Sequence, residues 1–108
     1  MNKITYEERR AVYEKALQTW GARNQIMMAI EEMSELTKEL CKHFRGRENM
    51  EEIADEIADV TIMLEQLRLI FGLNEEVCAH MDMKVLRLQA RLGFAADTNV
   101  GDKGGDGS

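Results

Sequence analysis

Two groups of carboxylates are the residues of this sequence best spaced to do chemistry. The first group is Glu31, Glu32 and Glu35, and the second is Glu56 and Asp59. Residues three or four apart lie on one face of a helix, so Glu32 with Glu35, and Glu56 with Asp59, each present two carboxylates side by side. Four carboxylates without nitrogen or sulfur ligands favour a hard cation, Mg²⁺ first, with Mn²⁺ or Ca²⁺ as alternatives. The sequence therefore offers four oxygen ligands to one metal site.

These acids also have a simpler interpretation, because a run of acids opposite an apolar stripe is usually a solvated helix face. Three features argue against it. Like charges three and four residues apart cost stability unless cations lie among them. Met28, Met63 and Ile70 interrupt or extend the acidic arcs, which predicts that these arcs are covered. The short connection between the two acidic segments predicts an antiparallel hairpin in which one motif faces the other.

Glycines divide the chain into the helices that would position these acids. There is no proline, and Gly21, Gly46, Gly72 and Gly93 are spaced as helix C-terminal stops. Four helices are expected, over about 5–20, 24–44, 50–71 and 75–92. No stretch alternates with period two, so the predicted fold class is all-α. One domain over 1–94 and a disordered glycine-rich tail over 95–108 are expected.

The two central helices are predicted to be amphipathic and to begin at recognisable residues. Thr5 with Glu8, and Asn49 with Glu52, match the pattern of a capping box. The apolar stripes repeat at intervals of three and four residues: Ile26, Ile30, Met33, Leu36, Leu40 and Phe44 in the first acidic helix, and Ile53, Ile57, Val60, Leu64, Leu67 and Phe71 in the second. The isolated Cys41 and Cys78 are expected to be buried free thiols.

The last predicted helix carries a short basic ridge made by His80, Lys84, Arg87 and Arg91. These side chains fall within an arc of about 60° at 100° per residue. A polyphosphate bound between a Mg²⁺ site and this ridge would have its charge met from two sides. An ordinary solvated basic edge with partners such as Glu76 remains the alternative.

Composition narrows the function classes further. A formal net charge of −6 argues against a general nucleic-acid or anionic-membrane binder. There is no apolar run of about 18 residues and no secretory leader pattern, so a cytoplasmic protein is expected. A chain of 108 residues can build only a thin helical bundle, which makes self-association plausible.

The motifs together resemble the MazG-type all-α nucleoside triphosphate pyrophosphohydrolases. The resemblance covers about residues 20–91 and rests on E-E-x-x-E at Glu31 to Glu35, E-x-x-D at Glu56 to Asp59, and the basic residues Lys84 and Arg87. It implies a four-helix MazG-like bundle completed by oligomerisation, as a homodimer or homotetramer. It also implies Mg²⁺-dependent hydrolysis of a nucleoside triphosphate to a monophosphate and pyrophosphate.

Carried over by position, the resemblance assigns the metal to Glu32, Glu35, Glu56 and Asp59, with Glu31 binding a second ion or orienting the attacking water. It assigns the phosphates to Lys84 and Arg87, beside Arg91 on the same ridge. Trp20 is a candidate to stack on the base, although packing in the core is its ordinary role, and Arg23 is a further substrate-binding candidate. Phosphoribosyl-ATP pyrophosphohydrolase and a non-catalytic helical interaction or regulatory module are the alternatives.

Overall fold

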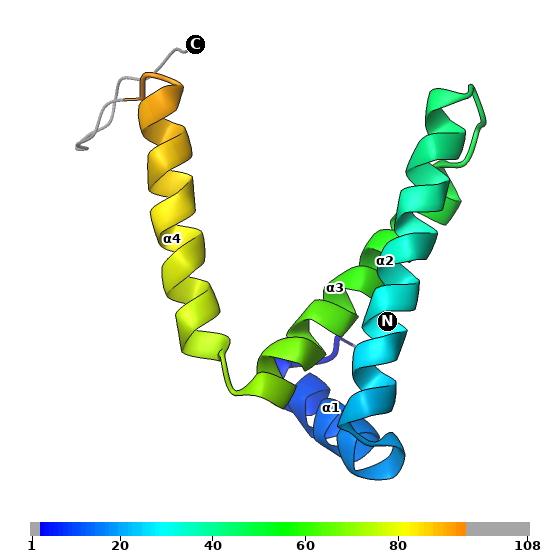
Figure 1. The fold of residues 1–108 in the computed structure, drawn as a ribbon, viewed down its shortest axis with the longest axis vertical. Coiled ribbons are helices and arrows are strands. Elements are labelled where there is room, and N and C mark those ends of the chain that lie inside the picture. Colours follow the sequence, from blue (N-terminus) through cyan, green and yellow to red (C-terminus); the bar gives the residue numbers. More distant parts are fainter. Residues whose placement is uncertain (1–2, 95–108) are drawn as a thin grey trace. The chain divides into compact units, whose positions relative to one another are not determined.

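The computed structural model describes residues 3–94, and within that range it contains four α-helices and no strand. The helices are α1 (Tyr6–Trp20), α2 (Ala22–Phe44), α3 (Met50–Phe71) and α4 (Asn74–Arg91) (Figure 1). The all-α prediction is confirmed. The chain divides into two compact units, one ending at Leu73 and the other beginning at Asn74. The predicted tail over 95–108 lies outside the described residues.

In the first unit, α2 and α3 form the predicted antiparallel hairpin, and α1 packs against both helices (Figure 1). The α2–α3 connection is only five residues long, 45–49, so the two helices have to run side by side. Gly72 ends α3 with φ 65° and ψ 36°, a left-handed conformation that glycine adopts without steric cost. Gly21, at φ 85° and ψ 155°, separates α1 from α2 in a different conformation with positive φ, which glycine also adopts readily.

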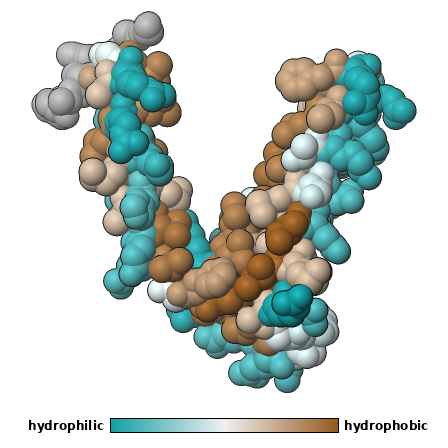
Figure 2. All heavy atoms as spheres, viewed as in Figure 1, coloured by the Kyte–Doolittle hydropathy of each residue, from teal (hydrophilic) through white to brown (hydrophobic). Residues whose placement is uncertain are grey.

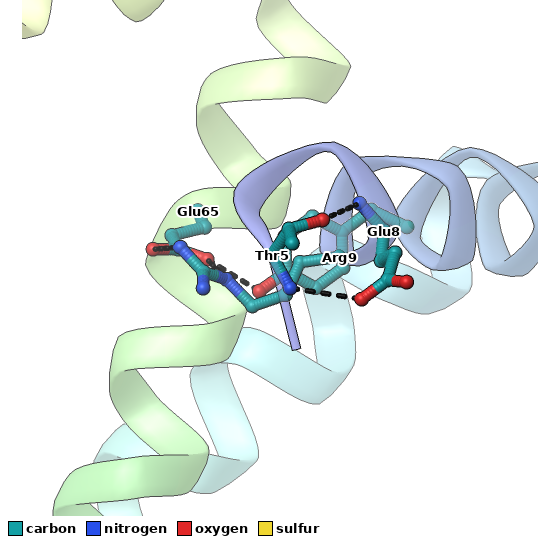
Figure 3. Close-up of polar contacts among 5 residues, drawn as sticks. Thr5, Glu8, Arg9 and Glu65 are labelled. Carbon is teal, nitrogen blue, oxygen red and sulfur yellow. Dashed lines mark hydrogen bonds and ion pairs between the residues drawn. The ribbon is translucent and has the colours of Figure 1, made fainter. Parts of the chain in front are cut away.

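One of the two predicted capping boxes forms. Thr5 Oγ1 accepts a hydrogen bond from the Glu8 backbone N–H at 3.0 Å, and the Thr5 N–H donates to Glu8 Oε1 at 2.9 Å (Figure 3). The box predicted for Asn49 and Glu52 is wrong, because the Asn49 side chain makes no cap hydrogen bond. Its amide donates instead to the backbone oxygen of Glu39 on α2, which joins the end of one helix to the start of the next.

A three-residue contact fastens α1 to α3. Arg9 donates from Nε to Glu65 Oε1 at 3.1 Å and from Nη2 to Glu65 Oε2 at 3.4 Å (Figure 3). The Tyr13 hydroxyl donates to the same carboxylate, and Tyr13 is buried. Burial, followed by the hydrogen bond to Glu65, raises the pKa of Tyr13 to about 12. An Arg carboxylate pair of this kind is directional as well as attractive, so it fixes where α1 crosses the hairpin.

The hairpin leaves part of each apolar stripe exposed. On α2 the buried residues are Gln25, Ala29 and Glu39, whereas Phe44 of the predicted stripe is 88 % exposed. Figure 2 shows apolar side chains on the visible surface of the hairpin. The exposed stripe residues are Ile30, Met33, Leu40 and Phe44 on α2, and Ile57, Leu64 and Phe71 on α3. The most deeply buried positions of the two helices are largely polar, Gln25, Glu39 and Gln66 among them. The remaining stripe residues are half-buried: Ile26, Leu36, Ile53, Val60 and Leu67.

The buried apolar side chains among the described residues are Tyr13, Ala29 and Met63. The second unit consists of α4, which taken by itself is an amphipathic helix with no buried residue. The prediction that Cys41 and Cys78 are buried is wrong, since both are exposed. Each lies on a face that no other helix of its own unit covers. None of the four helices is both long enough and apolar enough to cross a membrane.

Candidate metal centre

Three carboxylates from the two predicted motifs meet in the α2–α3 hairpin. Glu32 on α2 and Glu56 and Asp59 on α3 each offer an oxygen atom, and these oxygens all lie within 4.8 Å of one another. Glu56 and Asp59 share a face because they are three residues apart on one helix. Glu32 reaches them because the short connection at 45–49 holds the helices antiparallel. The three side chains are half-buried, so the cluster lies at the edge of the interface.

The negative charge gathered in the cluster favours binding of a cation. Partial burial, followed by the charge of Asp59, raises the pKa of Glu32, while a hydrogen-bonding contact with Glu56 opposes this rise. Partial burial, followed by the charge of Glu32, also raises the pKa of Glu56. Both carboxylates are therefore harder to ionise than in water, because partial burial and the neighbouring carboxylates disfavour the charged form. A divalent ion would reverse the sign of this local potential.

One carboxylate oxygen of the cluster lacks a partner. Glu56 Oε1 is fully shielded from solvent and accepts no hydrogen bond from protein. Buried polar atoms in folded proteins nearly always have a hydrogen-bond partner or an ion, and an exception calls for an explanation. An all-oxygen donor set with a free, buried carboxylate lone pair is the chemistry that Mg²⁺ and Mn²⁺ accept. The residues present therefore fit the cation that the motifs suggested.

The other acids of the two motifs are placed differently. Glu35 is exposed, and its Oε1 lies 3.2 Å from Lys38 Nζ, so its carboxylate is engaged with a lysine one turn along α2. Its charge nevertheless contributes to the raised pKa of both Glu32 and Glu56. Glu31 is exposed and contributes to the raised pKa of Glu32. The structure thus brings three of the four expected ligands together, with Glu35 and Glu31 at the periphery.

The substrate-binding candidates lie on exposed positions. Trp20, the last residue of α1, is 58 % exposed, so its interpretation as a core residue is wrong within this chain. The backbone oxygen of Trp20 accepts a hydrogen bond from Asn24 Nδ2 at 2.8 Å, which ties the end of α1 to the first turn of α2. Arg23 is exposed in that same turn. Lys84, Arg87 and Arg91 are exposed on α4, in the second unit.

Two buried polar pairs that the motifs did not indicate lie in the same α2–α3 interface. Gln25 Nε2 donates to Gln66 Oε1 at 2.6 Å, and Asn49 Nδ2 donates to Glu39 Oε1 at 2.8 Å. Gln25, only 1 % exposed, is the largest fully buried side chain among the described residues. The available signal was their spacing, since Gln25 and Glu39 lie seven residues before and after Glu32. Such a spacing keeps residues on one helix face.

No family model, curated protein or solved structure matches this chain. The carboxylate cluster and its surroundings are therefore the features of the chain that indicate a function.

Proposed function

We propose that this protein is a Mg²⁺-dependent hydrolase that cleaves nucleoside or deoxynucleoside triphosphates between the α and β phosphates. The observation that carries the proposal is the convergence of Glu32, Glu56 and Asp59, with the buried Glu56 Oε1 left without a partner. Hydrolysis at that bond consumes one water and yields a nucleoside monophosphate and pyrophosphate. This is the activity that the resemblance to MazG-type enzymes implies, and a role in cleansing the nucleotide pool would follow from it.

In this proposal Glu32, Glu56 and Asp59 hold the cation, and Glu35 joins them once its side chain leaves Lys38. Bound Mg²⁺ supplies positive charge against the phosphate oxygens and lowers the pKa of a coordinated water. We assign to Glu31, which is exposed beside Glu32, the role of orienting the attacking water or accepting its proton. Mn²⁺ is expected to substitute for Mg²⁺, because both cations prefer oxygen ligands.

The phosphates and the base are assigned to exposed residues outside the carboxylate cluster. Lys84, Arg87 and Arg91 are the positive side chains of α4 that we propose to bind the β and γ phosphates, on the basis of their charge and exposure. Trp20 and Arg23 are proposed to contact the nucleoside. The exposed indole of Trp20 is available for stacking, which needs an accessible aromatic face.

We further propose that the active form is a homodimer or homotetramer arranged as a MazG-like helical bundle. The exposed apolar stripes of α2 and α3 support this, because contiguous apolar surface on a small domain usually marks an interface. A second copy would bury these stripes and complete a core that holds few apolar side chains in one chain. Analytical ultracentrifugation tests the assembly, and a fully active, stable monomer would remove this part of the proposal.

The decisive experiment is a substrate panel. The full chain is incubated with each common dNTP and NTP and with phosphoribosyl-ATP, with and without Mg²⁺, and the products are separated by ion-exchange chromatography. We expect monophosphate and pyrophosphate in equal amounts and only with the cation. Asp59→Ala and Glu35→Ala should abolish release of pyrophosphate while circular dichroism shows an intact helical fold.

Glu48→Gln serves as the matched control, because Glu48 is an exposed acid in the α2–α3 connection and lies outside the cluster. It should retain full activity. Turnover of phosphoribosyl-ATP alone would move the assignment to the related pyrophosphohydrolase. Absence of turnover on every substrate, with the cation bound, would leave a non-catalytic cation-binding helical module.

A further inference from the structure

The α2–α3 interface contains three polar layers at regular spacing. Gln25, Glu32 and Glu39 follow one another at seven-residue intervals on α2. Asn49, the residue just before α3, precedes Glu56 by seven residues, and on α3 Gln66 follows Asp59 by seven. Seven residues are two helical turns, or about 10.5 Å of axial rise. The carboxylate cluster is therefore bracketed on both sides by a polar pair two turns away.

Each bracketing pair is buried and hydrogen-bonded across the two helices. Gln25 donates to Gln66 at 2.6 Å, and Gln66 Nε2 in turn donates to the Met63 sulfur at 3.6 Å. At the other end, Asn49 Nδ2 donates both to Glu39 Oε1 at 2.8 Å and to the Glu39 backbone oxygen at 2.9 Å. Because these bonds join specific atoms of α2 to α3 and to the residue just before α3, a shift of one helix along the other would break them.

These buried polar pairs are expected to stabilise the fold less than apolar pairs at the same positions would. Gln25 Oε1 and Asn49 Oδ1 are buried without a hydrogen-bond partner, in addition to the Glu56 oxygen. An unpaired buried acceptor is costly, and a well-packed apolar pair at the same positions would avoid that cost. The best-attested benefit of a buried polar pair between helices is that it specifies their register.

We infer that the Gln25–Gln66 and Glu39–Asn49 pairs are register locks that position Glu32 opposite Glu56 and Asp59. The inference rests on the proposed function insofar as the cluster is a metal site. A slip of one helical turn displaces one helix by about 5.4 Å along the other. Since Mg²⁺ binds oxygen at about 2.0–2.1 Å, carboxylates displaced that far no longer share one ion. The four lock residues are thus positioning residues, which act on the cation through the acids.

The test replaces the amide pair by an apolar pair of similar size, Gln25→Leu/Gln66→Leu, in the full chain. Register is measured without metal, by pulsed electron paramagnetic resonance between nitroxides at Ser34→Cys and Thr61→Cys, two exposed positions on α2 and α3. Cys41→Ser and Cys78→Ser remove the native thiols, and excess unlabelled chain isolates distances within one copy. Mn²⁺ affinity is measured on the same variants by its own resonance signal.

We expect one narrow distance in the parent chain and a broadened or second distance in the double variant. The Mn²⁺ affinity of the double variant should fall about 10-fold or more, the size of effect usual for residues that orient metal ligands. Glu39→Gln provides the matched control, because its side-chain oxygen still accepts the Asn49 hydrogen bond. Glu39→Gln should keep the narrow nitroxide distance and the Mn²⁺ affinity of the parent chain. Glu39→Leu should show a broadened distance and a lower Mn²⁺ affinity.

A folded double variant with an unchanged distance and unchanged Mn²⁺ affinity would overturn the inference. Should the double variant fail to fold, the comparison of Glu39→Leu with Glu39→Gln decides the same question at the other lock. If the parent chain binds no Mn²⁺, the proposed function fails, and the nitroxide distances alone then decide whether the locks set the register.

Discussion

Neutralising Glu32 should make the metal-free protein more stable and the metal-bound protein less stable. The carboxylate oxygens of Glu32 and Asp59 lie within 4.8 Å of each other. Two unit charges at that distance repel by about 0.9 kcal/mol in bulk water and about 3.5 kcal/mol at an effective dielectric constant of 20. Both groups are half-buried, so solvent screening keeps the repulsion near the lower value. Glu32→Gln should therefore raise the metal-free unfolding free energy by about 1 kcal/mol.

When a cation is bound, the parent protein should be more stable than Glu32→Gln. At a Mn²⁺ concentration 100 times its dissociation constant, binding to the folded state alone stabilises the parent protein by about 2.7 kcal/mol. Glu32→Gln removes one of three charged ligands, so Mn²⁺ should raise the unfolding free energy of this variant only slightly. In thermal denaturation at pH 7.5, the variant should melt about 4–8 °C above the parent without metal. In Mn²⁺ it should melt below the parent.

The control is Glu48→Gln, which removes an exposed acid outside the cluster. It should melt close to the parent without metal and gain as much as the parent from Mn²⁺. A Glu32→Gln protein that is no more stable than the parent in chelator, yet gains equally from Mn²⁺, would refute the reasoning. In that case the three acids would be an ordinary solvated face.

Three other predictions follow from the described contacts. Because the pKa of Glu56 is raised by folding, the metal-free parent should lose stability as the pH rises above about 4.5, the ordinary value, and through the raised pKa. The gap between Glu56→Gln and the parent in urea unfolding should therefore widen between pH 4.5 and 7.5, and a constant gap would contradict the shift. Tyr13→Phe removes the hydrogen bond to the Glu65 carboxylate and should cost about 1.5–3 kcal/mol in urea unfolding at pH 7; Tyr6→Phe, at an exposed position, is the comparison. Thr5→Ala breaks the capping box and should cost about 0.5–2 kcal/mol, with faster hydrogen exchange confined to the first turn of α1.

Helix content and the grouping of the acids could be predicted from the sequence alone. Glycine spacing predicted where the helices end, because few other residues adopt the left-handed conformation seen at Gly72. The three-residue interval between Glu56 and Asp59 placed them on one face, since helical geometry is local. The short connection around Gly46 then implied that Glu32 would face them. All these inferences use neighbours in sequence, and the proposed cation site depends on them.

Only the tertiary structure decided which faces of α2 and α3 are buried. Periodicity gives the angle between Glu32 and Phe44 around one helix, but it does not state which side another helix covers. That choice depends on contacts between residues far apart in sequence, such as Gln25 with Gln66 and Arg9 with Glu65. The hairpin buries polar residues such as Gln25, Glu39 and Gln66, while part of each apolar stripe and Cys41 are exposed.

Asn49 is a single residue whose side-chain partner the sequence pattern did not predict. Its position before α3 predicted a local cap, because Asn at that position usually bonds the first turn of its own helix. In the folded chain the amide reaches the backbone and carboxylate oxygens of Glu39 instead. The competing acceptors belong to another helix, so no local pattern could have revealed them. Sequence determined which residues share a helix face, and the packing of α2 on α3 determined what each face meets.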